Sequence, residues 1–93
     1  MNLLALVVPT KDRPQDLAKL LASLAAQTRR PDQLIVVDGS DPAIKHVCDE
    51  AQGLAVDYVQ VFPPSLAAQR NAGMRELRAD ITHAGYLDDD IVL

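Results

Sequence analysis

The chain has 93 residues, of which 48% are hydrophobic and 24% are charged. This balance is typical of a globular protein, and the length allows one small hydrophobic core but not two. The formal net charge is −4 with a pI near 4.8, which argues against the clustered basic face that broad nucleic-acid binding needs. A local basic site for one phosphorylated ligand stays compatible with this charge balance.

Cysteine content and hydropathy point to a compartment. The chain has one cysteine, Cys48, so an internal disulfide is impossible and a reducing environment is expected. Residues 1–9 are mostly apolar but lack the basic start and the small-residue cleavage site of a signal peptide. No stretch approaches the roughly 20 apolar residues of a membrane-spanning helix. We therefore expect a cytoplasmic protein, either free or peripheral to the inner face of the membrane.

The hydrophobic pattern predicts alternating strands and helices. Short apolar or β-branched runs that end in turn sequences indicate strands, whereas apolar side chains spaced by three and four residues indicate helices. Proline is expected to begin the first two helices, and Ser65 is expected to cap the third. In chain order, the expected strands cover 3–8, 33–37, 56–62 and 84–87, and the expected helices cover 14–27, 42–53 and 65–79.

This order predicts an α/β fold over residues 1–93. The βαβαβαβ succession with short connections indicates a Rossmann-like, three-layer arrangement, in which helices cover both faces of a mainly parallel sheet. Gly73 lies inside the third predicted helix, which indicates either a close packing contact or a break in that helix. No linker composition marks a second domain.

Polar residues follow three of the predicted strands. Thr10-Lys11-Asp12-Arg13 follows the first, Asp38-Gly39-Ser40-Asp41 follows the second and Asp88-Asp89-Asp90 follows the fourth. Ligands of open α/β sheets bind beyond the carboxyl ends of the strands, so we expect these groups to line one crevice. Cations there suit phosphates, and carboxylates suit a base, a ribose or a divalent cation. The predicted ligand is therefore a nucleoside diphosphate with a metal ion.

Each of these residues also has a purely structural interpretation. The acidic triplet is also consistent with a polar turn, and Asp38 is also consistent with an ordinary turn residue. Thr10 is equally consistent with simple strand termination, and Arg13 with a solvated side chain beside a proline. Arg70 is consistent with an exposed helical face.

Four segments resemble the inverting GT-A glycosyltransferases of family 2, in the order in which that family has them. The segments are residues 6–13, similar to a V-P-T-x-N-R turn, 35–42, similar to V-V-D-x-S-x-D, 66–73, similar to A-x-x-R-N-x-G, and 87–90, similar to D-x-D. The segments are spread along the chain, so the resemblance extends over its whole length. Lys11 stands where an aromatic residue is common in the family, and Asp12 stands where Asn is common.

The resemblance implies a donor-binding site. The implied nucleotide-sugar-binding residues are Thr10, Arg13, Asp38, Arg70, Asp88 and Asp89. Within this set, Asp38 would contact the nucleobase and Arg70 would lie near the base and the diphosphate. Asp90 would bind Mg²⁺ or Mn²⁺, both of which take hard oxygen ligands. The metal and the arginine would stabilise charge on the leaving diphosphate.

The resemblance also implies the reaction. A sugar would pass from a nucleoside diphosphate sugar to a carbohydrate or lipid-linked acceptor with inversion, which requires a general base. In the family this base lies downstream of the acidic motif, so we expect it beyond Leu93 and expect no catalytic residue within the chain. Residues 1–93 would then be an inactive nucleotide-sugar-binding half-domain of a longer enzyme. Its uncovered sheet edge, including residues 91–93, would favour self-association.

Three other functions fit part of the pattern. A nucleotidyltransferase shares the alternating plan and the metal, but it has a Gly-rich loop after the first strand, which the sequence lacks. A receiver-type phosphoacceptor domain needs an acidic pair at that position, where the chain has Thr10-Lys11-Asp12-Arg13. A noncatalytic nucleotide-sugar-binding or structural fragment fits the same residues as the glycosyltransferase does.

Overall fold

The computed structural model describes residues 2–51 and 53–90. Strands and helices alternate in the predicted order: β1 (Leu4–Thr10), α1 (Pro14–Ala25), β2 (Gln33–Asp38), α2 (Lys45–Glu50), β3 (Val56–Gln60), α3 (Leu66–Arg75) and β4 (His83–Tyr86). The strand pairs are parallel, and the sheet order is β3-β2-β1-β4. The predicted α/β class is confirmed.

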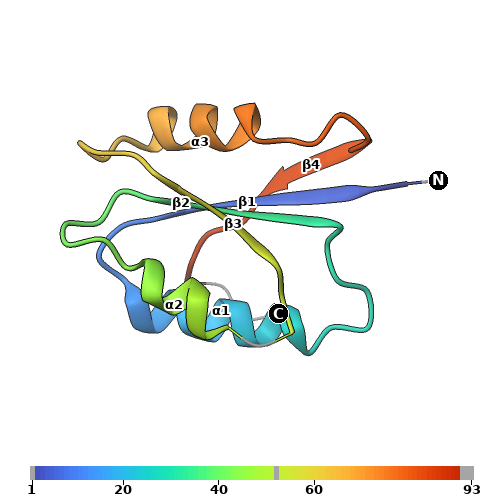
Figure 1. Ribbon diagram of the computed structural model, residues 1–93, viewed down its shortest axis with the longest axis horizontal. Coiled ribbons are helices and arrows are strands. Elements are labelled where there is room, and N and C mark those ends of the chain that lie inside the picture. Colours follow the sequence, from blue (N-terminus) through green and yellow to red (C-terminus); the bar gives the residue numbers. More distant parts are fainter. Residues whose placement is uncertain (1, 52, 91–93) are drawn as a thin grey trace.

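The helices cover the sheet from both sides. Figure 1 shows α1 and α2 on one face of the sheet and α3 on the other. Because successive side chains of a strand point to opposite faces, β1 and β2 contribute to two core clusters. The cluster on the side of α1 and α2 contains Val8, Leu17, Leu20, Leu21, Leu24, Leu34, Val36, Ile44, Val47 and Cys48. The cluster beneath α3 contains Val7, Ile35 and Val37.

Cys48 is a core residue, as its helical spacing predicted. Cys48 is 7% exposed, and burial raises the pKa of its thiol to about 11. The thiol is therefore protonated at neutral pH, which suits a packing role.

Several predicted helix boundaries differ from the structure, and two of these differences arise from tertiary hydrogen bonds. Helix α2 begins at Lys45 rather than at Pro42, since the Ile44 N–H donates to the Asp38 carboxylate at 2.8 Å and holds the preceding residues as a turn. Helix α3 ends at Arg75 rather than near residue 79. The Arg78 N–H donates to Oε1 of Gln33 at 2.9 Å instead of continuing the helix.

At Gly73, α3 packs closely against the sheet. A Cβ atom at this position would overlap the side chain of Val7 and would lie 3.2 Å from Cγ2 of Val37. The glycine therefore marks a close packing contact inside a continuous helix, which is one of the two alternatives that the sequence left open.

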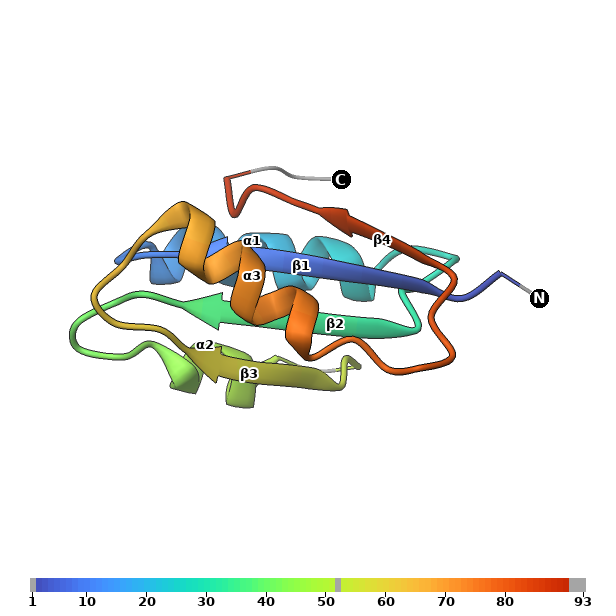
Figure 2. The same ribbon diagram turned by 90° about the horizontal axis from the view of Figure 1, so that it is seen from above.

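The sheet has β3 and β4 as its edge strands within the described part of the chain. Figure 2 shows α3 running across the sheet, with β4 beside β1. The prediction of self-association through this edge stays a prediction, and residues 91–93 lie outside the described residues. None of the described helices has the length and hydropathy needed to cross a membrane.

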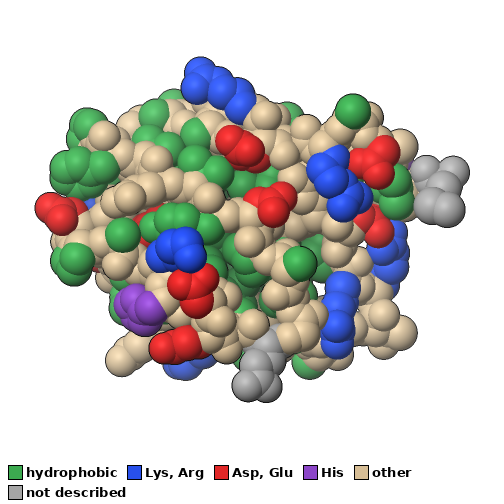
Figure 3. Space-filling view, viewed as in Figure 1, with side chains coloured by type: hydrophobic (Ala, Val, Ile, Leu, Met, Phe, Trp, Pro, Cys, Tyr) green, Lys and Arg blue, Asp and Glu red, His purple; other side chains and the backbone are tan. Residues whose placement is uncertain are grey.

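Charged side chains of both signs are mixed on the surface. On the face shown in Figure 3, the Lys and Arg side chains are interspersed with Asp and Glu side chains. Three adjacent acidic residues, Asp88, Asp89 and Asp90, instead follow the carboxyl end of β4.

Candidate functional site

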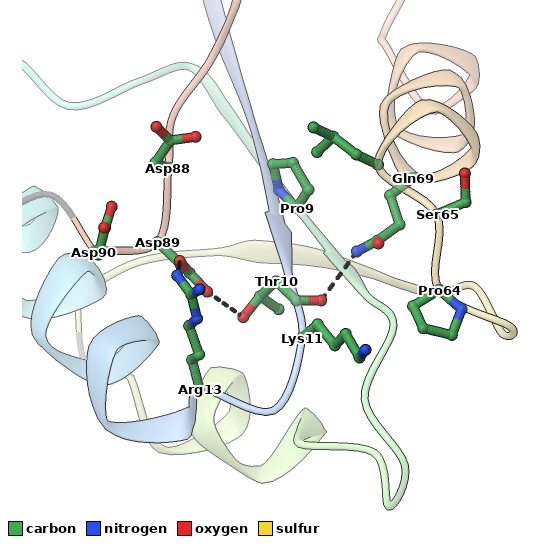
Figure 4. A pocket seen from close by; sticks show the side chains of 11 residues that line it. Pro9, Thr10, Lys11, Arg13, Pro64, Ser65, Gln69, Asp88, Asp89 and Asp90 are labelled. Atoms are coloured by element: carbon green, nitrogen blue, oxygen red, sulfur yellow. Dashed lines mark hydrogen bonds and ion pairs between the residues drawn. The ribbon is translucent and has the colours of Figure 1, made fainter.

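A pocket of about 450 Å³ opens at the carboxyl ends of β1 and β4 and at the start of α3 (Figure 4). It is lined by Pro9, Thr10, Lys11, Arg13, Pro64, Ser65, Leu66, Gln69, Asp88, Asp89 and Asp90. The two strands are parallel, so their carboxyl ends meet at the same edge of the sheet, where ligands of such folds bind. Five of the seven residues predicted for the site line this pocket.

Asp89 is the buried member of the acidic triplet. Its residue is 5% exposed. One carboxylate oxygen accepts a hydrogen bond from the Thr10 hydroxyl at 2.9 Å, and the other accepts one from Nη1 of Arg13 at 3.2 Å. These contacts join the segment after β4 to the end of β1. Asp89 therefore has a clear structural role, and it also holds the half-exposed guanidinium of Arg13 at the pocket.

Asp88 and Asp90 are exposed, in contrast to Asp89 between them. Figure 4 shows that the three carboxylates do not converge on one point. Among the residues that the structure describes, no group of three His, Cys, Asp or Glu side chains is placed to hold a metal ion. Mg²⁺ sites at phosphates, however, commonly use one or two carboxylates and take their other ligands from the phosphates and water. Asp88 and Asp90 fit a site of that type.

The first loop of the pocket supplies two cations to the same lining. Lys11 and Arg13 both line the pocket, and Asp12 between them has a φ angle of 54°. This left-handed conformation is tolerated best by Gly, Asn and Asp. It explains how an Asp can stand where the resembling family commonly has Asn. The Asp12 N–H donates to Oγ of Ser40 at 2.7 Å, which links the loops after β1 and β2.

Asp38 lies at the end of β2 but does not line the pocket. It is fully buried, and its carboxylate accepts hydrogen bonds from the Ser40 N–H at 2.8 Å, the Ile44 N–H at 2.8 Å and the Tyr58 hydroxyl at 2.6 Å. Burial alone would raise the pKa of Asp38, but the hydrogen bonds outweigh it and hold the pKa below its usual value. In this structure the carboxylate organises the loop between β2 and α2.

Arg70 also lies outside the pocket lining. Its guanidinium carbon is 5.0 Å from the centre of the Tyr86 ring, which places the side chain between α3 and β4. Its Nε atom is buried and has no hydrogen-bond partner among the described residues. The preceding residue, Gln69, reaches the pocket instead.

Gln69 is a pocket residue that the sequence reasoning did not select. It is 4% exposed, and Nε2 donates to the carbonyls of Thr10 at 2.9 Å and Val37 at 3.0 Å. A polar side chain in the first turns of a helix usually indicates a solvated face, so this pattern offered no reason to place Gln69 in the pocket. Its spacing of four residues from the helix cap Ser65 places both on one helix face and is the signal that was available.

Comparisons with known proteins identify relatives of the chain. The family model described as glycosyl transferase family 2 matches residues 5–93. The galactofuranosyltransferase GlfT1 of Mycobacterium tuberculosis is 44% identical over 71 residues, which cover 72% of this chain and 20% of that protein. The same values hold for GlfT1 of a second strain, so the chain spans about a fifth of the length of these curated relatives.

Two solved structures share the fold. The crystal structure of S. aureus TarS 1–349 has a TM-score of 0.77 at 24% identity and covers 99% of this chain and 28% of that chain. A second S. aureus TarS crystal structure has a TM-score of 0.72 at 23% identity, with coverage of 97% and 17%. The likeness confirms the Rossmann-like GT-A arrangement. With its family model matched over residues 5–93, the chain belongs to glycosyl transferase family 2.

Proposed function

We propose that the pocket binds a nucleoside diphosphate sugar and that the protein transfers this sugar, with inversion, to a carbohydrate or lipid-linked acceptor. Family membership supports glycosyl transfer over the nucleotidyltransferase and receiver interpretations. The observation that carries the donor assignment is the charge arrangement of the pocket. Asp88 and Asp90 have no hydrogen bond or ion pair with a described residue, yet they line the same pocket as the cations Lys11 and Arg13.

Such an arrangement complements a metal diphosphate. Asp90, with Asp88 beside it, would hold Mg²⁺ or Mn²⁺, and the bound metal would supply charge stabilisation for the leaving diphosphate. Arg13 and Lys11 would bind phosphate oxygens directly. Asp89 would orient Arg13 through the 3.2 Å ion pair, and Thr10 would orient Asp89.

Asp38 and Arg70 receive indirect roles in this proposal, because neither lines the pocket. Asp38 would hold the loop after β2, which contacts the loop after β1 through Ser40 and Asp12. Arg70 would keep α3 and β4 in place through Tyr86. The general base and the acceptor pocket are proposed to lie outside residues 1–93, since the carboxylates of the pocket are already assigned. The buried thiol of Cys48 supports a reducing compartment, and we propose the cytoplasm.

The name of the relative GlfT1 makes a galactofuranosyl donor the first sugar to test. Nucleotide binding is tested first, by titration calorimetry with UDP and with GDP in the presence of Mn²⁺. We expect binding that needs the metal and that Asp90→Ala abolishes. Asp57→Asn is the matched control, because Asp57 lies on β3 away from this pocket and its remaining carbonyl oxygen can still accept the hydrogen bond from Gln33.

Two results would contradict the proposal. Equal nucleotide affinity in EDTA and in Mn²⁺ would show that the metal has no role in nucleotide binding. Unchanged Mn²⁺-dependent binding by Asp90→Ala, in a variant that unfolds at the same urea concentration as the parent, would remove Asp90.

A further inference from the structure

Gln69 has an amide whose orientation is fixed by its surroundings. Nε2 donates to the carbonyl oxygens of Thr10 and Val37, at the ends of β1 and β2. A flipped amide would place Oε1 against these two oxygens, which can only accept hydrogen bonds. The side-chain oxygen therefore has to point away from the two carbonyls, and it can act only as an acceptor.

This oxygen has no partner within the described part of the chain, although its residue is 4% exposed. Among the described residues, Nε of Arg70 is the side-chain polar atom that is both sealed from solvent and without a hydrogen-bond partner. Oε1 of Gln69 is not sealed in this way. Oε1 of Gln69 thus keeps contact with solvent, and the residue that carries it lines the pocket. A largely buried acceptor is costly unless water or a ligand donates to it.

Gly39 lies against this oxygen, at a position where a larger residue would crowd it. A Cβ atom at residue 39 would lie 3.1 Å from Oε1 of Gln69 and 2.8 Å from Cβ of Pro64. The Gly39 N–H also donates to the Thr10 carbonyl at 2.9 Å, so this carbonyl accepts from both Gly39 and Gln69. The acceptor is consequently held on a rigid unit made by the ends of β1 and β2 and the start of α3.

The two sides of the pocket differ in charge. Figure 4 shows Asp88, Asp89 and Asp90 on one side of Thr10, and Gln69 with Ser65, Pro64 and the cation Lys11 on the other. The proposed diphosphate and metal belong on the acidic side beside Arg13. The side of α3 offers an uncharged acceptor and the apolar side chains of Pro64 and the exposed Leu66, which suit a nucleoside.

We propose that Oε1 of Gln69 determines nucleoside specificity by accepting a hydrogen bond from the donor substrate. The donating group is either the ring N–H of the base or the ribose 2′-hydroxyl. This inference rests on the proposed function, because it assumes that the pocket binds a nucleoside diphosphate. Gln69 acts in binding and orientation and takes no part in the chemical step.

Titration calorimetry in Mn²⁺ tests the proposal with UDP or GDP, whichever binds more tightly, and two analogues. One analogue is methylated at the ring N–H, and the other lacks the 2′-hydroxyl. The parent protein should bind one of the analogues about tenfold more weakly than the unmodified nucleotide, as expected for one hydrogen bond. That analogue identifies the donating group. Gln69→Met should weaken the unmodified nucleotide by a similar factor and abolish the discrimination.

The exposed Gln60, at the end of β3, provides the matched control. Gln60→Met should leave both affinity and discrimination unchanged. Since Gln69→Met also removes the two hydrogen bonds to Thr10 and Val37, the parent protein gives a second measurement. In ¹⁵N NMR spectra, the side-chain amide signal of Gln69 should shift with the unmodified nucleotide and shift less with the discriminated analogue.

Three outcomes would overturn the inference. The first is equal binding of all three nucleotides by the parent protein. The second is discrimination that persists in Gln69→Met. The third is a uniform loss of affinity for all three nucleotides in that variant, which indicates a structural role alone. A parent protein that binds neither UDP nor GDP contradicts the proposed function itself, and the inference with it.

Discussion

The carboxylates that follow β2 and β4 have opposite environments. Asp38, at the end of β2, is fully buried and accepts three hydrogen bonds. Asp88 and Asp90, after β4, are exposed and have no hydrogen-bond or ion-pair partner among the described residues. Asp89 lies between Asp88 and Asp90 in sequence but resembles Asp38, because its carboxylate is satisfied by Thr10 and Arg13.

Residue type and strand-end position alone do not assign a role to these carboxylates. The hydrogen-bond donors around each carboxylate do. Satisfied carboxylates fix the loops at the carboxyl ends of the strands, and unsatisfied ones remain available to a ligand. Preorganised binding groups need such support, because a side chain on an unsupported loop is poorly placed. The satisfied carboxylate of Asp89 therefore helps to position its sequence neighbours Asp88 and Asp90.

The largest expected effect is on the stability of Asp38→Ala. The substitution leaves the Ser40 and Ile44 N–H groups and the Tyr58 hydroxyl without their acceptor, and it should lower the free energy of unfolding by about 3–5 kcal/mol. Asp90→Ala should change it by less than about 0.5 kcal/mol, because the exposed carboxylate has no partner to lose. Urea unfolding measures both. Similar losses for the two variants would contradict the distinction between them.

The second prediction concerns pH. The hydrogen bonds lower the folded-state pKa of Asp38, so its contribution to stability is fully present above the unfolded-state pKa, which is about 3.9 for Asp. The contribution is lost as the pH falls through the lower pKa of the folded state. The stability difference between the parent protein and Asp38→Asn should therefore shrink below about pH 4.

Thermal unfolding between neutral and acidic pH measures this difference. Asp32 also has a lowered pKa, caused first by its hydrogen bond from Arg29, but it is present in both proteins and its effect cancels. A difference between parent and Asp38→Asn that stays constant down to the most acidic pH would show that the Asp38 carboxylate gains nothing from its charge.

Much of the fold is predictable from local sequence. Leu17, Leu20, Leu21 and Leu24 of α1 follow the helical spacing and are all buried, and β2 is buried along its full length, as its β-branched run predicted. The wrong helix boundaries depend on contacts that no local pattern contains. Gln33 and Arg78 are 45 residues apart in the chain, and their hydrogen bond accompanies the end of α3.

The site was predictable in outline for the same reason. Parallel strands bring their carboxyl ends to one edge, so the meeting of residues 10–13 with 88–90 follows from topology. Which carboxylate is satisfied does not follow, since the donor for Asp89 is a hydroxyl 79 residues away and one donor for Asp38 is 20 residues away. The pocket role of Gln69 depends likewise on the carbonyls of two distant strands.

The smallest expected effect tests the link between Asp89 and β1. Thr10→Val keeps the shape of the side chain but removes the hydroxyl that donates to Asp89, which should lower the free energy of unfolding by about 1–2 kcal/mol. Arg13 compensates little, because its side chain is 56% exposed and ion pairs of this kind contribute little. Thr10→Ser keeps the hydroxyl and should retain more of this stability than Thr10→Val does.

The same three proteins distinguish support of the pocket from direct binding. If Thr10 acts through Asp89, Thr10→Val should weaken Mn²⁺-dependent nucleotide binding while Thr10→Ser restores it, and urea unfolding should follow the same order. A Thr10→Val protein with parental stability and weakened binding would instead place the hydroxyl on the ligand. Asp89 would then depend on Arg13 alone, and the contrast between Asp89 and its neighbours Asp88 and Asp90 would be smaller than the hydrogen bonds indicate.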